Sequence, residues 1–212
     1  MDKVELQRSV QLTVAESVFR KSGRIFVPVA SSARHVHLCR QDCEALFGKE
    51  HCLTELKKLS QPGQFACNEQ VTIIGPKGQL GKVRVLGPER KATQVEISLT
   101  DTFWLGVRAP VRMSGKTVGT PGCRLVGPAG EITISEGVIV AARHLHLSAE
   151  QAALFGLRDG QTVCLRSDGE RAVTFEKVIV RAGTGHDMEV HLDTDEANAI
   201  AMAGSTMMEV LP

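Results

Sequence analysis

The sequence has few aromatic residues and no surplus of charge of one sign. Phe, Trp and Tyr make up 4% of the 212 residues, tyrosine is absent, and the formal net charge at pH 7 is +1. Proteins that bind nucleic acids need a basic patch to neutralise phosphates, and single-strand binders add aromatic side chains on which bases stack. We therefore expect no nucleic acid among the partners of this chain.

Long apolar runs and paired cysteines are missing as well. No apolar run reaches the roughly 20 residues that a membrane-spanning helix needs. Acidic residues interrupt the apolar residues of the N-terminus (Asp2, Glu5 and Glu16), which is unlike a secretory signal. The six cysteines include no Cys-x-x-Cys pair and no visible disulfide framework. These absences predict no membrane partner and a reducing, cytoplasmic location.

Residues 4–20 have the pattern of an amphipathic helix, and the segment KSGR at 21–24 follows it as a hinge. The apolar residues of its stripe recur every four positions, at Leu6, Val10, Val14 and Val18. Two interpretations stay open. The helix packs on the body of its own chain, or it is a detachable helix that docks on another protein.

Beyond residue 24 the pattern is mostly that of β-strands. Short β-branched or alternating runs are separated by Gly-Pro and other glycine-containing turns. The clearest runs are 71–74, 82–86, 95–99, 131–134, 162–165, 177–180 and 188–192. Many short strands with little helix indicate a mainly β fold of the barrel or sandwich type.

An internal repeat divides this β-rich part into two copies. VPVASSARHVHL (27–38) matches GVIVAARHLHL (137–147), and each runs into a short helical stretch that ends in Phe-Gly. In the second copy Ser148 and Gln151 form a capping box that begins this stretch. The first copy has extra polar residues at 49–66, which we interpret as an inserted loop.

Each copy contains His-x-His at the end of a β-branched run: His35 and His37, then His144 and His146. Residues two apart in a strand point to the same face, so each pair presents two imidazoles side by side. This geometry suits one metal ion. In the alternative interpretation, the histidines hydrogen-bond the backbone at a domain junction.

The repeat also suggests a third ligand for each pair. Aligning VEISL (95–99) on MEVHL (188–192) places Glu96 against Glu189, and Ser98 against His191. The first set then gains Glu96 and the second gains His191. Three protein ligands with one open position are typical of a catalytic zinc site. The histidines at 51 and 186 are interpreted as surface residues.

Other polar residues are candidates for anion binding. Arg90 lies six residues before Glu96, and its guanidinium could bind a phosphate through two hydrogen bonds. Its alternative interpretation is an exposed arginine in a polar turn. Lys77 and Arg84 are ordinary surface charges unless a ligand lies near them. Cys39 aligns with Ser148, which favours a position at the start of a helix.

These motifs resemble the PduL family of phosphate propanoyltransferases, which are found with bacterial microcompartments. The resemblance covers residues 25–200 in the family's motif order, and the segments that carry it are SSARHVHL, KLSQPGQ, VTIIGPKGQL, VRVLGPER, QVEISLTD, RMSG, GTPG, GVIVAARHLHLS and VHLDTDEANA. It implies a mainly β fold of two tandem, strand-swapped β-barrel domains with short capping helices and an active site at their junction. Barrel one would consist of 24–33 plus 142–212, barrel two of 34–141 including the loop 49–66, and 1–23 would be the N-terminal helix and hinge.

The resemblance further implies two zinc ions per chain. One would be bound by His35, His37 and Glu96, and the other by His144, His146 and His191. Phosphate would contact Arg90, with Ser114 of RMSG near the site. Coenzyme A would contact Ser31, Ser32, Ala33, Lys77, Arg84 and Asn198. Cys39 stands where the family would have serine. The N-terminal helix would be an encapsulation peptide that contacts shell or core proteins of a microcompartment, and the chain could form a homo-oligomer.

The implied function is that of a phosphate acyltransferase. It would convert propanoyl-CoA or another short-chain acyl-CoA and phosphate to acyl phosphate and CoA, reversibly. No Ser-His-Asp or Cys-His arrangement is visible in the sequence, so we favour direct, zinc-assisted attack of phosphate over a covalent acyl-enzyme. Two alternatives remain: a zinc-dependent thioesterase or phosphoesterase, and a non-catalytic zinc-binding barrel.

Overall fold

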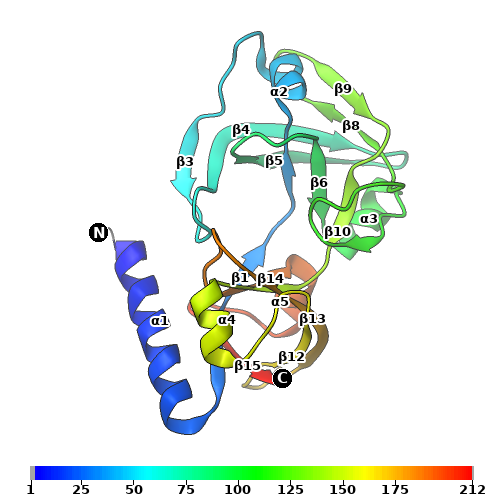
Figure 1. Cartoon of the computed structure of the whole chain (residues 1–212). Coiled ribbons are helices and arrows are strands. Elements are labelled where there is room, and N and C mark those ends of the chain that lie inside the picture. The colour runs from blue at the N-terminus through cyan, green and yellow to red at the C-terminus, as the bar shows by residue number, and fades with distance from the viewer. Residues whose placement is uncertain (1–2, 212) are drawn as a thin grey trace. The chain divides into compact units, whose positions relative to one another are not determined.

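Strands outweigh helices in the computed structural model, which describes residues 3–211 (Figure 1). The helices are α1 (Lys3–Ser22), α2 (Arg40–Phe47), α3 (Leu99–Leu105), α4 (Ala149–Phe155) and α5 (Thr194–Ala199). The strands are β1 (Ile25–Ser32), β2 (His35–His37), β3 (Glu55–Lys58), β4 (Phe65–Ile74), β5 (Gln79–Gly87), β6 (Gln94–Ile97), β7 (Val111–Arg112), β8 (Cys123–Val126), β9 (Glu131–Ile134), β10 (Val138–Ala141), β11 (His144–Leu147), β12 (Thr162–Arg166), β13 (Thr174–Ala182), β14 (Glu189–Asp193) and β15 (Met207–Leu211).

The chain divides into two compact units. The first consists of Met1–Ser31, Arg143–Leu192 and Glu196–Pro212, and the second of Ser32–Ala142 with Asp193–Asp195. Among the described helices, none is both long and apolar enough to span a membrane.

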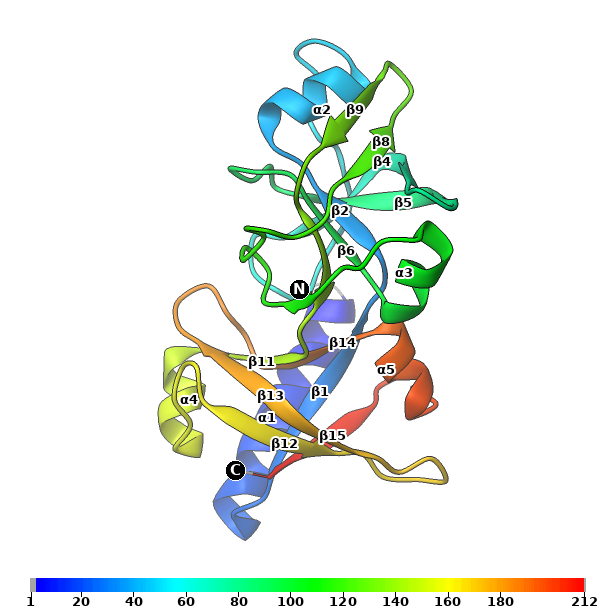
Figure 2. The same ribbon diagram turned by 90° about the vertical axis from the view of Figure 1, so that its right-hand side faces the viewer.

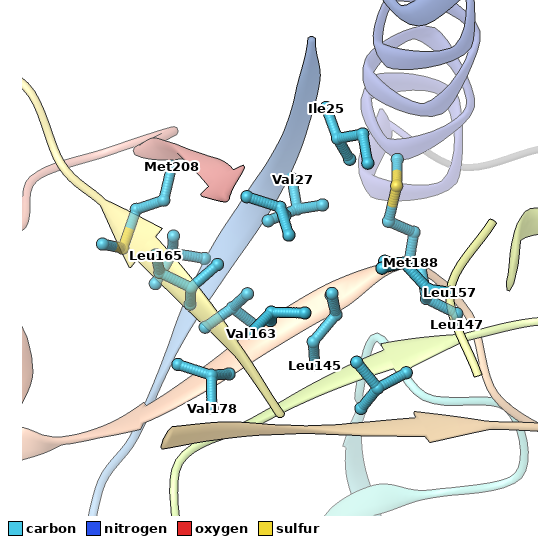
Figure 3. Packing of buried hydrophobic residues seen from close by; sticks show 14 of the residues in the cluster. Ile25, Val27, Leu145, Leu147, Leu157, Val163, Leu165, Val178, Met188 and Met208 are labelled. Atoms are coloured by element: carbon cyan, nitrogen blue, oxygen red, sulfur yellow. The ribbon is translucent and has the colours of Figure 1, made fainter. Parts of the chain in front are cut away.

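The first unit is a closed barrel with the strand order β1-β14-β11-β13-β12-β15. β1 comes from the N-terminal part of the chain and closes the barrel by antiparallel pairing with β15, with Ile25 opposite Val210. Side chains from β1, β11, β12, β13 and β15 fill the interior (Figure 3). Val27, Leu145 and Leu165 are fully buried there. Burial of this apolar surface is the main stabilising contribution to the barrel.

Helix α1 runs along the outside of this barrel (Figures 1 and 2). Ala15 belongs to the barrel core, and Leu12 and Phe19 pack against it. The ring of Phe19 meets the ring of Phe155 edge to face, with centroids 5.0 Å apart. The stripe expected from the sequence points elsewhere, because its residues Leu6, Val10 and Val14 are 50%, 54% and 53% exposed. The helix therefore packs on its own chain through a different face from that stripe.

The second unit is built on one curled sheet. Its strand order is β7-β10-β6-β2-β5-β4-β8-β9, with β3 paired to β4. Val36, Val85, Val95 and Leu125 lie in its core. The predicted mainly β class with barrel architecture and few short helices is confirmed, and this second sheet takes the form of a half-barrel (Figure 2). Residues 49–66 are more ordered than the predicted loop, because β3 pairs antiparallel with the start of β4.

The helix starts follow the sequence closely. Ser148 begins α4 with the predicted capping box to Gln151. Ser98 begins α3 with an equivalent box to Asp101, directly after β6. Cys39 is the N-cap residue of α2, as expected, and its side chain makes no capping hydrogen bond. These caps end the strands that carry the candidate ligands and fix where the chain leaves the sheet.

Candidate metal centres

Strand β2 holds the first histidine pair between β5 and β6. In its antiparallel pairing with β6, His35 lies opposite Glu96 and His37 lies opposite Gln94. Directly opposite residues in an antiparallel pair share a face of the sheet, so the four side chains form one patch. His35, His37 and Glu96 are buried, and their potential ligand atoms all lie within 4.8 Å of one another. We call these three residues the first set.

Backbone carbonyls orient both histidines of the first set. His35 Nδ1 lies 2.8 Å from the Ala33 carbonyl oxygen, and His37 Nδ1 lies 3.3 Å from that of Leu86. When each ring is neutral, as it must be to bind a metal, Nδ1 carries the proton and Nε2 keeps its lone pair. The two Nε2 atoms face the carboxylate of Glu96, at 3.5 and 3.8 Å. Such hydrogen bonds to the remote ring nitrogen are the usual support of metal-binding histidines.

The electrostatics of the first set are those of a cation site. Burial alone would raise the pKa of Glu96, but the charge of His35 and its hydrogen bond outweigh burial and hold this pKa below its ordinary value. Burial, the charge of His35 and that of Arg90 lower the pKa of His37 to about 3. At neutral pH His37 is therefore an uncharged ligand beside a charged carboxylate, as a metal ion requires.

A hydrogen-bonded chain links the first set to Arg90. The guanidinium donates to the Ser114 hydroxyl at 2.9 Å, and this hydroxyl donates to Glu96 Oε1 at 2.8 Å. Gln94, which the sequence analysis missed, donates from its side-chain amide to Glu96 Oε1 at 2.5 Å and accepts from Gly115 N–H at 2.7 Å. Arg90 is thus half-buried at the first set, and its interpretation as an exposed arginine is wrong.

Strands β11 and β14 hold the second pair of histidines in the barrel unit. His144 lies opposite His191, and His146 lies opposite Glu189. The Nε2 atoms of His144 and His146 are 3.0 Å apart, and the potential ligand atoms of His144, His146 and His191 all lie within 4.8 Å of one another. We call these three histidines the second set. Glu189 Oε2 lies 2.9 Å from His191 Nε2.

His186 belongs to the surroundings of the second set. Its ring lies 4.4 Å from that of His146, centroid to centroid, and its Nδ1 is buried, so the interpretation of His186 as a surface residue is wrong. Burial and then the charges of His144 and His191 hold the pKa of His146 well below its ordinary value. His51 is also not free in solvent, because its Nε2 lies 2.8 Å from Glu69 Oε1.

The strand registers correct the alignment of the two copies. Glu96 and His191 occupy the same place, each opposite the first histidine of its pair. Gln94 and Glu189 are equivalent in turn, each opposite the second histidine. The alignment made from sequence, with Glu96 against Glu189, is therefore two residues out of register. A shift of two keeps every side chain on its face, so periodicity alone could not detect it.

Both sets fit a zinc ion. The protein donors that bind zinc are thiolate sulfur, imidazole nitrogen and carboxylate oxygen. Each set offers three such donor atoms, all of them imidazole nitrogens or carboxylate oxygens. Nδ1 of His146 is buried without a hydrogen-bond partner among the described residues, which is consistent with a site whose polar neighbours include a group other than protein.

The structure distributes the remaining predicted site residues over several places. Ser31 and Ser32 end β1, and the Ala33 carbonyl supports His35. The Arg84 guanidinium donates to the carbonyl oxygens of Cys67 and Asn68. The remaining two side chains are exposed, Lys77 in the turn after β4 and Asn198 in α5. Among these residues, Arg90, Ser114 and Ala33 hydrogen-bond the first set or a group bonded to it, and Arg84 lies beside His35 where β2 pairs with β5.

Comparison with known proteins identifies the family of this chain. The family model of phosphate propanoyltransferases matches residues 28–203. Similar proteins named phosphate propanoyltransferase include those of Thermotoga maritima (50% identity; 86% of each chain), Rhodobacter capsulatus (47%; 87% of this chain and 86% of the relative) and Enterococcus faecalis (44%; 95% of each chain). The chain therefore belongs to the phosphate propanoyltransferase family of acyltransferases.

Proposed function

We propose that this chain transfers a short-chain acyl group, in the first instance propanoyl, reversibly between coenzyme A and inorganic phosphate. Family membership supplies the reaction class. The observation that supports its chemistry is the pair of buried three-ligand sets, His35, His37 and Glu96 in one unit and His144, His146 and His191 in the other. Each is proposed to bind one zinc ion and leave a coordination position open.

Arg90 is the proposed phosphate ligand. Its guanidinium already bonds the Ser114 hydroxyl, which bonds the Glu96 carboxylate, so an anion held there lies beside the first set. A guanidinium binds phosphate through two parallel hydrogen bonds, which orients one phosphate oxygen for attack. Ser114 is proposed to hold the Arg90 guanidinium at a fixed position relative to the Glu96 carboxylate.

The reaction proposed is direct transfer. A phosphate oxygen forms a bond to the thioester carbonyl carbon, the carbon–sulfur bond breaks, and coenzyme A leaves as the thiolate while acyl phosphate is formed. Zinc would act as a Lewis acid toward the developing oxyanion. The residues Ser31, Ser32, Ala33, Lys77, Arg84 and Asn198 are proposed to contact coenzyme A.

The partner of α1 is proposed to be a shell or core protein of a bacterial microcompartment inside the cytoplasm. The exposed residues Leu6, Val10 and Val14 support this proposal, because they leave an apolar stripe on a helix whose other face is used. An amphipathic helix commonly docks such a stripe in a groove of its partner.

A turnover assay tests the function. The enzyme is given acetyl-, propanoyl- or butanoyl-CoA with and without phosphate, and release of free thiol is measured alongside acyl phosphate. Thiol release that requires phosphate supports the transferase. Thiol release without phosphate would identify a thioesterase, and no release from any substrate would favour a non-catalytic zinc-binding barrel.

A further inference from the structure

The two metal centres share one plan but differ in where the carboxylate stands. In each, two histidines of one strand face two residues of its antiparallel neighbour. The facing residues are Glu96 and Gln94 at the first set, and His191 and Glu189 at the second. Each facing pair contains one carboxylate. At the first set it stands opposite the first histidine, and at the second set opposite the second histidine.

At the first set the neutral residue supports the charged one. The Gln94 amide donates to Glu96 Oε1 and is itself fixed by the N–H of Gly115. Gln94 is 3% exposed, so its bonds are not shared with bulk solvent. The carboxylate is a ligand candidate here, and its glutamine neighbour holds it in place.

At the second set the roles are exchanged. Glu189 Oε2 lies 2.9 Å from His191 Nε2, and the side chains of the two residues are only 11% and 21% exposed. An ionised carboxylate only accepts hydrogen bonds, so this contact places a proton on Nε2 of His191. A protonated nitrogen cannot bind a metal, and the lone pair of the neutral ring is then on Nδ1. His35 and His37 have the opposite arrangement, with Nδ1 bonded and Nε2 available.

We propose that Glu189 is a positioning residue of the second metal centre, which holds His191 through Nε2 so that Nδ1 is presented to the ion. Three neutral imidazoles do not compensate the double positive charge of a zinc ion. The buried Glu189 carboxylate supplies a negative charge that acts on the ion through His191. Carboxylate–histidine–metal triads of this kind fix the ring orientation and strengthen the ligand. The inference rests on the metal centre proposed above.

The test measures zinc affinity at the second set by itself. A His35→Ala background removes a ligand of the first set, so that competition with a chromophoric chelator reports on the second. In this background Glu189→Ala is expected to weaken zinc binding by about 10- to 100-fold. Glu189→Gln is expected to recover part of the loss, because its amide oxygen still accepts from Nε2–H but carries no charge. Glu176→Ala, which removes an exposed carboxylate of β13, is the matched control and should bind zinc normally.

Three results would overturn the inference. One is unchanged zinc affinity in Glu189→Ala. Another is equal loss in the alanine and glutamine variants. The third concerns Co²⁺ bound in place of zinc, whose visible absorption reports its coordination number. If the coordination number differs between Glu189→Ala and the parent protein, Glu189 is a direct ligand. The variant His191→Ala distinguishes an error about Glu189 from an error about the second metal centre. If zinc binding survives His191→Ala as well, the second centre itself is wrong.

Discussion

The Nε2 atoms of His144 and His146 lie 3.0 Å apart on one face of β11, opposite to the face that carries the core residue Leu145. Two buried imidazole nitrogens at this distance are held together either by one shared proton or by a common ion. Burial and then the charges of His144 and His191 lower the pKa of His146, so this ring is uncharged at neutral pH. The zinc ion proposed for the second set would accept both lone pairs.

His146→Ala should remove one zinc ion per chain. Metal analysis of the wild-type protein is expected to find about two, one for each three-ligand set, and about one in the variant. Acyl transfer should be abolished. Circular dichroism checks that the variant is folded, and Glu176→Ala serves as the exposed-residue control. Full activity of the variant with one zinc would contradict the role of two ions in catalysis.

Arg90→Ala should raise the KM for phosphate by about tenfold or more, which is the scale of a lost charge-assisted hydrogen bond. Zinc content should stay at the wild-type value, because the proposed partner of Arg90 is an oxyanion. Arg90→Lys should restore only part of the affinity, since an ammonium lacks the planar pair of donors. Initial rates against phosphate concentration at saturating propanoyl-CoA measure these effects. An unchanged KM in Arg90→Ala would remove this residue from the phosphate site.

The Glu69 cluster predicts a pH dependence of stability. Glu69 accepts from Thr54 N–H and the Thr54 hydroxyl and lies 2.8 Å from His51 Nε2. Burial opposes ionisation, but these hydrogen bonds outweigh it and keep the pKa of Glu69 below the ordinary 4.5. A carboxyl group with a depressed pKa stabilises the fold in full above pH 4.5 and loses this contribution as pH falls through its folded value.

Glu69→Gln should therefore lower the free energy of unfolding by about 1–3 kcal/mol at pH 7. The difference from wild type should shrink as pH is lowered from 4.5. Urea unfolding curves of both proteins at several pH values measure it, with Glu176→Gln as the exposed control. A difference that grows at low pH would show that Glu69 is not stabilised as the carboxylate.

Much of the fold could be predicted because the repeat is visible in the residues themselves. The His-x-His motifs, the strand runs and the capping box at Ser148 depend on neighbours a few positions apart. The roles of Gln94 and Glu189 could not be predicted, because they depend on which residue faces each of them across a strand pair. A two-residue shift in register leaves the alternation of faces unchanged.

His186 and helix α1 show a second limit. His186 follows a Gly-Thr-Gly segment that is typical of an exposed turn, and only the three-dimensional path of the chain brings its ring against His146. Helix α1 has apolar residues on more than one face. The regular four-residue stripe was visible in the sequence, whereas the face that packs is the less regular one at Leu12, Ala15 and Phe19.

Because α1 packs on the barrel through the face of Leu12, Ala15 and Phe19, deleting the helix and substituting its exposed stripe should have different effects on stability. Deleting residues 1–22 removes the contacts of Leu12, Ala15 and Phe19 with the barrel. At about 1.5–3 kcal/mol for each large apolar side chain buried, the deletion should cost several kcal/mol and lower the melting temperature.

Replacing Leu6, Val10 and Val14 together by serine should instead leave the melting temperature near that of wild type, because these side chains are about half exposed. Activity in solution should also be unchanged. Co-localisation with microcompartment shells, followed with a fluorescent fusion in cells, should be lost in the triple variant if the stripe is the docking face. Wild-type co-localisation of a well-folded triple variant would contradict that role. A truncated protein as stable as wild type would show that the packing of Ala15 on the barrel contributes little.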